Sequence, residues 1–272
     1  MNGLPVHPMQ TNIYLRLTDE FNAGKQRAII CSGQAAVLHR IAIMSKDGDW
    51  ILREDTETCR HILSVLQEHG AHYRFGAPLD IRWLAHGWSS HFEFFFGVMR
   101  IRADFFTRPP RITNRELAAL WKRQSDRHPP FVDIVTLARQ KQTDREKDYA
   151  VIGELARQMK STTNQLMFSR SALDLMRLAK NHPALVKKLA KERPLLAAIS
   201  VNDRDRIEAS LDTERRYLIH RNENRLARFE EAAGCWRKRW PKLARHASDL
   251  PLLKAHAFLV KEAARYLPKS VS

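Results

Sequence analysis

The chain has 272 residues, of which 44% are hydrophobic and 28% charged, an ordinary composition for a soluble globular protein of one or two domains. No apolar run approaches the roughly 18 residues of a membrane span, and the N-terminus lacks the basic start and apolar centre of a signal peptide. Three cysteines, Cys31, Cys59 and Cys235, are too few and too widely spaced for a disulfide framework or a zinc site. We therefore expect a cytoplasmic protein with reduced thiols and no membrane association.

The net charge of +16 is concentrated in the second half of the chain. Residues 1–110 contain 12 basic and 11 acidic residues, whereas residues 111–272 contain 34 basic and 19 acidic ones. Such an excess favours a polyanionic partner, with nucleic acid first. The alternative is a well-solvated helical surface, because lysine and arginine are good helix formers.

The first half of the chain alternates predicted strands and helices. Apolar runs bounded by glycine or charged residues predict the strands, and apolar residues at helical spacing predict the helices. The last two strands are expected to pair around Gly97. We place strands at 26–32, 50–54, 71–75, 91–97 and 98–106, and helices at 33–41 and 55–70.

Beyond the TRPPRI segment every predicted element is a helix. Thr143, with Glu146 three residues later, predicts a capping box at the start of one of them. Further along, Phe229, Ala232, Trp236 and Trp240 form an apolar stripe that we assign to the core or to a seam between helices. The predicted helices cover 114–123, 131–140, 143–160, 163–181, 183–192, 203–240 and 251–266.

These patterns predict an α+β fold in two domains. Residues 1–110 would form a mixed sheet with helices, and residues 111–272 a basic, all-helical domain.

Two carboxylates stand close together in the sequence IAIMSKDGDWIL (41–52). An Asp-Gly pair between apolar residues is a common hairpin turn, so Asp47 and Asp49 can be read as turn residues. In a strand, however, residues two apart face the same side, and both acids would then serve one site. A third acid, Asp104, lies in the predicted strand at 98–106 and is costly to bury without a cation or a partner. Three acids near the glycine turn at Gly33 form an oxygen-ligand set for Mg²⁺, and this interpretation explains more of the chain than the turn does.

This arrangement resembles the polymerase-beta-type nucleotidyltransferase superfamily. The family pattern is a Gly-Ser or Gly-Gly at a strand end, two acids separated by one residue, and a later acid on a neighbouring strand. Here Gly33-Gln34 is followed by Asp47-Gly48-Asp49 and then by Asp104. Within the superfamily the chain looks most similar to small bacterial nucleotidyltransferases of the abortive-infection toxin type, whose basic helix start resembles KQTDREKDYAVIGEL (141–155).

The resemblance implies a metal-dependent enzyme that moves a nucleoside monophosphate from an NTP to an acceptor hydroxyl. Asp47, Asp49 and Asp104 would be catalytic and would bind Mg²⁺ or Mn²⁺. The family favours tRNA as acceptor, with a protein hydroxyl second, and implies a toxin role with an antitoxin partner. The residues implied in nucleotide binding are Ser32, Gly33, Gln34, Lys141, Arg145 and Asp148, the last of which can also act on the helix dipole.

Two other classes of function stay open from the sequence. Gln34 and Gly48 depart from the family pattern and favour a catalytically degenerate core that only binds nucleic acid. A structural or antitoxin role through the helical tail is the third. The histidines, His91 among them, show no metal-ligand spacing and are interpreted as surface or core-edge residues.

Overall fold

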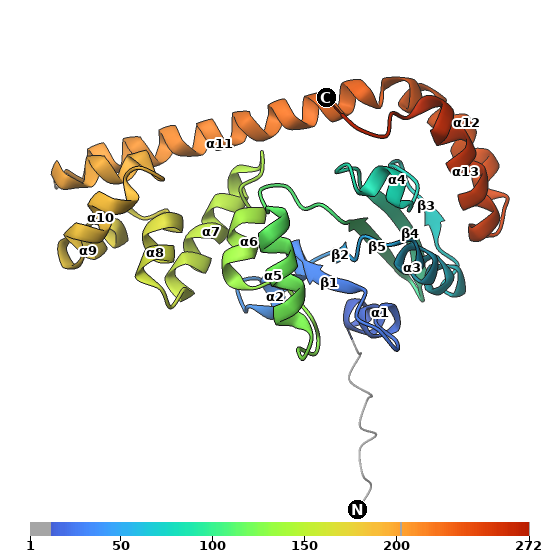
Figure 1. The fold of residues 1–272 in the computed structure, drawn as a ribbon, viewed down its shortest axis with the longest axis horizontal. Helices are drawn as coiled ribbons and strands as arrows, with labels where there is room; N and C mark the ends of the chain where they lie inside the picture. Colours follow the sequence, from blue (N-terminus) through green and yellow to red (C-terminus); the bar gives the residue numbers. More distant parts are fainter. Residues whose placement is uncertain (1–11, 202, 272) are drawn as a thin grey trace, which may run out of the picture.

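The computed structural model describes residues 12–201 and 203–271, which form a mixed α/β part followed by a helical part (Figure 1). The predicted fold class is confirmed. Residues 1–11, on which the signal-peptide argument rests, lie outside the described residues. None of the helices in the described ranges is long and apolar enough to cross a membrane.

Five strands form one sheet in the order β1-β2-β5-β4-β3. β2 and β5 are parallel neighbours at its centre, and the other three pairings are antiparallel. β4 and β5 form the predicted hairpin, with Gly97 at a φ of +59° in its loop. The strands are β1 (Ala28–Cys31), β2 (Asp47–Leu52), β3 (His72–Tyr73), β4 (Ser90–Phe96) and β5 (Met99–Phe106).

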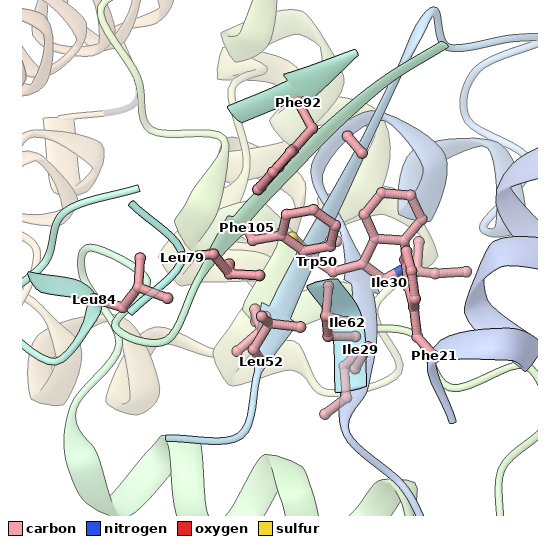
Figure 2. Close-up of a cluster of buried hydrophobic side chains, with 14 of the residues drawn as sticks. Phe21, Ile29, Ile30, Trp50, Leu52, Ile62, Leu79, Leu84, Phe92 and Phe105 are labelled. Carbon is pink, nitrogen blue, oxygen red and sulfur yellow. The ribbon is translucent and has the colours of Figure 1, made fainter. Parts of the chain in front are cut away.

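One face of this sheet is covered by hydrophobic side chains (Figure 2). Trp50 stacks on Phe105 at a centroid distance of 5.4 Å and meets the edge of Phe21 at 5.2 Å. Phe21 comes from α1, a helix that the sequence analysis missed. The helices of this part are α1 (Ile13–Phe21), α2 (Ser32–Leu38), α3 (Thr56–Glu68) and α4 (Ile81–Leu84).

The remaining described residues are helical, as predicted, with shorter elements than expected. The segment predicted at 163–181 is two helices, and the one at 203–240 is interrupted at Ala233. The elements are α5 (Asn114–Gln124), α6 (Ile134–Gln140), α7 (Glu146–Gln158), α8 (Thr162–Phe168), α9 (Ala172–Asn181), α10 (Pro183–Leu189), the 3₁₀ helix η1 (Pro194–Val201), α11 (Arg204–Ala232), α12 (Gly234–Ser248) and α13 (Leu252–Tyr266).

The capping box predicted at Thr143 is wrong. α7 begins after Arg145, and the Thr143 hydroxyl donates to Asp148 instead. A capping box does occur at the start of α5, where Thr113 and Glu116 exchange both hydrogen bonds.

The long helix α11 carries the chain from the α8–α10 end of the molecule back to the sheet, where α12 and α13 pack against β3 and α3 (Figure 1). The apolar stripe packs on the core during this return, so its assignment to the core is confirmed. Phe229 meets Trp88 at 5.0 Å, Trp240 meets Phe75 at 5.7 Å, and the Trp236 indole donates to the carbonyl of Gly76. One core cluster therefore joins residues on both sides of position 110, and the domain division at that position stays a prediction.

Candidate active site

The three predicted acids lie on the sheet face opposite the hydrophobic core. Asp47 and Asp49 belong to β2, so the turn interpretation of KDGD is wrong. Asp49 pairs in register with Asp104 of β5, and Asp47 pairs with Arg102. Because β2 and β5 are parallel neighbours, facing side chains on them lie roughly 5 Å apart. The structure thus brings Asp49 and Asp104 side by side, with Asp47 two residues earlier on the same face.

The register extends across four strands. Cys31 of β1 pairs with Asp49, and Asp104 pairs with His91 of β4, which forms a row of four chemically reactive side chains. His91 Nδ1 lies 2.8 Å from Asp104 Oδ1, although the two atoms are not aligned for a hydrogen bond. The sequence analysis set His91 aside, but the hairpin contained the signal. A two-residue loop at 97–98 pairs Phe96 with Met99, and counting five residues along each strand pairs His91 with Asp104.

Asp49 has the strongest electrostatic perturbation among these acids. Burial raises its pKa to about 7, and the neighbouring charges of Asp104 and Asp47 contribute, while Lys141 and His91 act in the opposite direction. Within the described part of the chain, no hydrogen bond or ion pair to the Asp49 carboxyl is present. A half-buried carboxyl without a partner, next to two further acids, is destabilising unless a proton or a cation is bound there.

Asp47 and Asp104 each have a cationic neighbour. Arg74 Nη1 lies 3.4 Å from Asp104 Oδ1, and Arg102 Nη1 lies 3.6 Å from Asp47 Oδ1. This Oδ1 atom of Asp47 is itself buried and accepts no hydrogen bond. The sequence analysis did not assign Arg74 and Arg102 to the site. Arg102 shares a face of β5 with Asp104, whereas Arg74 follows β3 and reaches Asp104 only in the folded protein.

The turn from β1 into α2 lies close to the start of β2. Ser32 has a φ of +49°, a left-handed conformation that costs a non-glycine residue about 1–2 kcal/mol. A Cβ atom on Gly33 would lie 2.2 Å from Ser45 Oγ, so only glycine allows this approach. The side chain of Gln34 is buried and donates to the carbonyls of Ser45 (3.0 Å) and Asp47 (3.4 Å). Gln34 thus positions the strand that carries the acids, and its amide points into the protein.

Gly48 has a packing explanation. A Cβ atom at this position would lie 2.3 Å from the indole ring of Trp50 and 2.6 Å from Tyr14. The Trp50 ring fills the space that an aliphatic side chain between the two acids would occupy. Trp50 is fully buried, so β2 is held firmly despite the glycine.

Of the three predicted nucleotide-binding residues in the helical part, Asp148 is the most buried. It accepts hydrogen bonds from Thr143 (2.6 Å) and Lys141 (3.0 Å), and Arg145 pairs with it at 2.9 Å. Burial alone would raise the pKa of Asp148, but the Thr143 hydrogen bond and the two positive charges lower it. Asp148 therefore holds Lys141 near the acids, where the Lys141 charge acts on Asp49. Arg145 is half exposed and remains accessible to a ligand.

The residue types at this site are those that bind a divalent cation, but their side chains are not placed to hold one together. Carboxylate oxygens are the ligands that Mg²⁺ and Mn²⁺ prefer, and the unpartnered Asp49 and the buried Asp47 Oδ1 provide free acceptors. As the side chains stand, the described residues contain no group of three or more His, Cys, Asp or Glu placed to hold a metal ion.

No family model and no curated protein matches the sequence. Among solved structures, the chain is similar to a "putative nucleotidyltransferase from H. pylori", with 11% identity and a TM-score of 0.37. The match covers 80% of this chain and 98% of that one. A likeness of this size carries no functional conclusion, so the function has to be argued from the residues of the site.

Proposed function

We propose that the protein is a nucleotidyltransferase that transfers a nucleoside monophosphate from an NTP to a hydroxyl of an acceptor, with nucleic acid favoured. The observation that carries the proposal is the pairing of Asp49 with Asp104 on adjacent parallel strands, with Asp47 on the same face. The glycine turn between β1 and α2, packed against the segment that leads into β2, supports it. The net charge of +16 supports a negatively charged acceptor, for which the resemblance favours tRNA over a protein hydroxyl.

In this reaction the acceptor oxygen forms a bond to the α-phosphorus, and the bond from that phosphorus to the bridging oxygen breaks. Pyrophosphate leaves with the electron pair, and the acceptor proton passes to a carboxylate of the site, for which Asp104 is the candidate. When bound by Asp47, Asp49 and Asp104, Mg²⁺ or Mn²⁺ would supply neutralisation of the phosphate charge. Lys141 and Arg145 are the candidates for contacting the triphosphate from the helical part.

The proposal is tested by incubating the protein with each radiolabelled NTP, Mg²⁺ or Mn²⁺, and total tRNA. We expect label on the RNA, and we expect Asp49→Asn and Asp104→Asn to abolish it while melting cooperatively. Asp126→Asn is the matched control, because it makes the same chemical change at an exposed position after α5, outside the sheet. Labelling that survives both Asp substitutions would refute the assignment of the site.

A second candidate function has one observation in its favour. Arg74 and Arg102 already place positive charge beside Asp104 and Asp47, where a catalytic centre would place metal ions. In that case the sheet is a degenerate core and the protein binds nucleic acid without chemistry. Absence of transfer and of NTP binding with either metal, together with retained RNA binding, would favour this candidate.

A toxin role, an antitoxin partner and a cytoplasmic location rest on the sequence analysis alone. Co-expression with the neighbouring gene product, followed by co-purification, would test the partner and the role together. Relief of growth inhibition by that product is the expected outcome for a toxin–antitoxin pair.

A further inference from the structure

Three hollows follow one side of α11, and none of them is lined by a residue of the acid row. Their volumes are about 1360, 510 and 260 Å³, and Arg221 lines all three. Arg206 lines the largest, and Arg228 lines the other two. Because they share α11 residues, the hollows adjoin one another along the helix, and we describe them together as one groove. We call Arg111, Arg206, Arg221, Arg225 and Arg228 the arginine groove.

The arginines of the groove differ from those on the other sides of α11. Arg204, Arg215 and Arg216 pair with acids of the same helix at 2.9 Å or less. In the described ranges, by contrast, no carboxylate lies within ion-pair distance of any arginine of the groove. Two acids line the largest hollow, and Glu214 among them is neutralised by Arg170 and Arg193. The groove therefore carries a net positive charge, with five arginines against Glu192 and against Asp144, whose charge reaches Arg111 and Arg225.

Backbone and side-chain hydrogen bonds hold Arg111 among the other arginines of the groove. It has a φ of +66°, and its guanidinium donates to the carbonyls of Arg139 and Gln140 and to Asn222 of α11, all at 2.8–2.9 Å. Burial lowers the pKa of Arg111 to about 10, and Arg225 adds to the decrease. The side chain of Arg225 is itself partly buried, and its Nε atom has no hydrogen-bond partner. Crowding arginines in this way is unfavourable unless an anion is bound nearby.

The groove also leads toward the acid row. The carbonyls that Arg111 binds belong to the last turn of α6, directly before Lys141. Gln142, directly after Lys141, lines two of the hollows. α11 passes over α6 and α7 at this point (Figure 1), and its Asn222 also bonds Asp144 at 3.0 Å.

The dimensions decide which kind of anion fits. Arg206 and Arg228 are 22 positions apart on one helix, which at 1.5 Å per residue is about 33 Å. A single small anion covers only a fraction of that length, whereas several consecutive phosphates of a nucleic acid strand would span it. Tyr217 is 62% exposed on the wall of two hollows and offers a face for base stacking.

We infer that the arginine groove binds the phosphate backbone of a single-stranded nucleic acid and directs its end to the acid row. The role of this strand as acceptor rests on the proposed function, whereas its binding does not. Binding alone is therefore the quantity to measure.

The test uses the full-length protein in EDTA without NTP and a fluorescein-labelled RNA of mixed sequence, about 20 nucleotides long, followed by fluorescence anisotropy. The variant is Arg221→Gln/Arg228→Gln, which alters two exposed residues. The matched control is Arg204→Gln/Arg216→Gln, which changes the net charge equally on other sides of α11. Loss of two phosphate contacts should reduce the magnitude of the slope of log K, the association constant, against log salt concentration by about 1.4. Near 0.1 M salt this corresponds to binding about 25-fold weaker.

We expect that loss for the groove variant and less than about a twofold change for the control. Tyr217→Ala should weaken binding about fivefold or more, because one stacking contact is removed. Equal affinities of the two double variants, or no RNA binding by the wild type, would overturn the inference. Displacement of the RNA by polyglutamate of the same total negative charge would also overturn the inference, because it would indicate an acidic protein partner. The effect of Asp49→Asn on labelling with NTP is measured in a separate experiment. Failure of the inference about the groove and failure of the proposed function are therefore distinguishable.

Discussion

The unpartnered Asp49 carboxyl makes a prediction about stability that is independent of any enzymatic assay. Replacing it with asparagine keeps the shape of the side chain and removes the charge. An ordinary aspartate titrates near pH 4 in the unfolded chain, whereas the pKa of Asp49 in the folded protein is raised to about 7. The protonated form is therefore the one that the fold favours.

The sign of the effect follows from this raised pKa. The stability associated with protonated Asp49 is fully present below about pH 4, and it is lost as the pH rises through about 7. A difference of about three pKa units corresponds to at most about 4 kcal/mol. Because the side chain is only half-buried, solvent screens part of this, and we expect about 2–4 kcal/mol at pH 8.

Urea denaturation followed by circular dichroism in EDTA, at several pH values from about 4.5 to 8, measures this difference. Asp49→Asn should be more stable than the wild type by about 2–4 kcal/mol at pH 8 and nearly equal to it at the acidic end. Asp126→Asn, at an exposed position after α5, is the control and should show no such trend. A wild type as stable as Asp49→Asn at pH 8, or a difference that does not change with pH, would refute the electrostatic reasoning.

Three further predictions concern the residues around the acids. Adding Mg²⁺ at about 100 times its Kd should stabilise the wild type by about 2.7 kcal/mol and leave Asp49→Asn unchanged in thermal melts. Gly48→Val should destabilise the protein by about 1–3 kcal/mol in urea denaturation, because its side chain would overlap the Trp50 ring; an unchanged midpoint would contradict the packing explanation. Asp148→Asn should cost about 3 kcal/mol near pH 7, because it leaves the buried Lys141 without its partner. Since the pKa of Asp148 is lowered, this cost should disappear as the pH falls through that pKa, and a constant difference between pH 7 and strongly acidic pH would contradict it.

Local patterns in the sequence were sufficient for most of the elements and for the three acids. Apolar runs located β4, β5 and the second half of β2, which begins three residues before the strand predicted at 50–54. The spacing of two between Asp47 and Asp49 predicted that both face one side if they lie in a strand. The period of the helices located most of the helical part, because an amphipathic helix repeats within a few residues. α1 was missed although local signals for it are present: Asn12 is a favoured N-cap residue, and Ile13, Leu17 and Phe21 recur at helical spacing.

The tertiary structure alone decided which strands are neighbours and what surrounds the acids. The parallel pairing of β2 with β5 joins segments more than 50 residues apart, and no local period encodes that choice. No local period encodes the position of α11, which brings Arg221 over the loop at Gln142. The contacts by which the apolar stripe packs α12 against the sheet are likewise not encoded locally. Side-chain chemistry and short-range period are properties of the chain itself. The surroundings of Asp49 and the partners of Asp104 and Arg111 are set by packing between distant segments, so only the folded protein determines them.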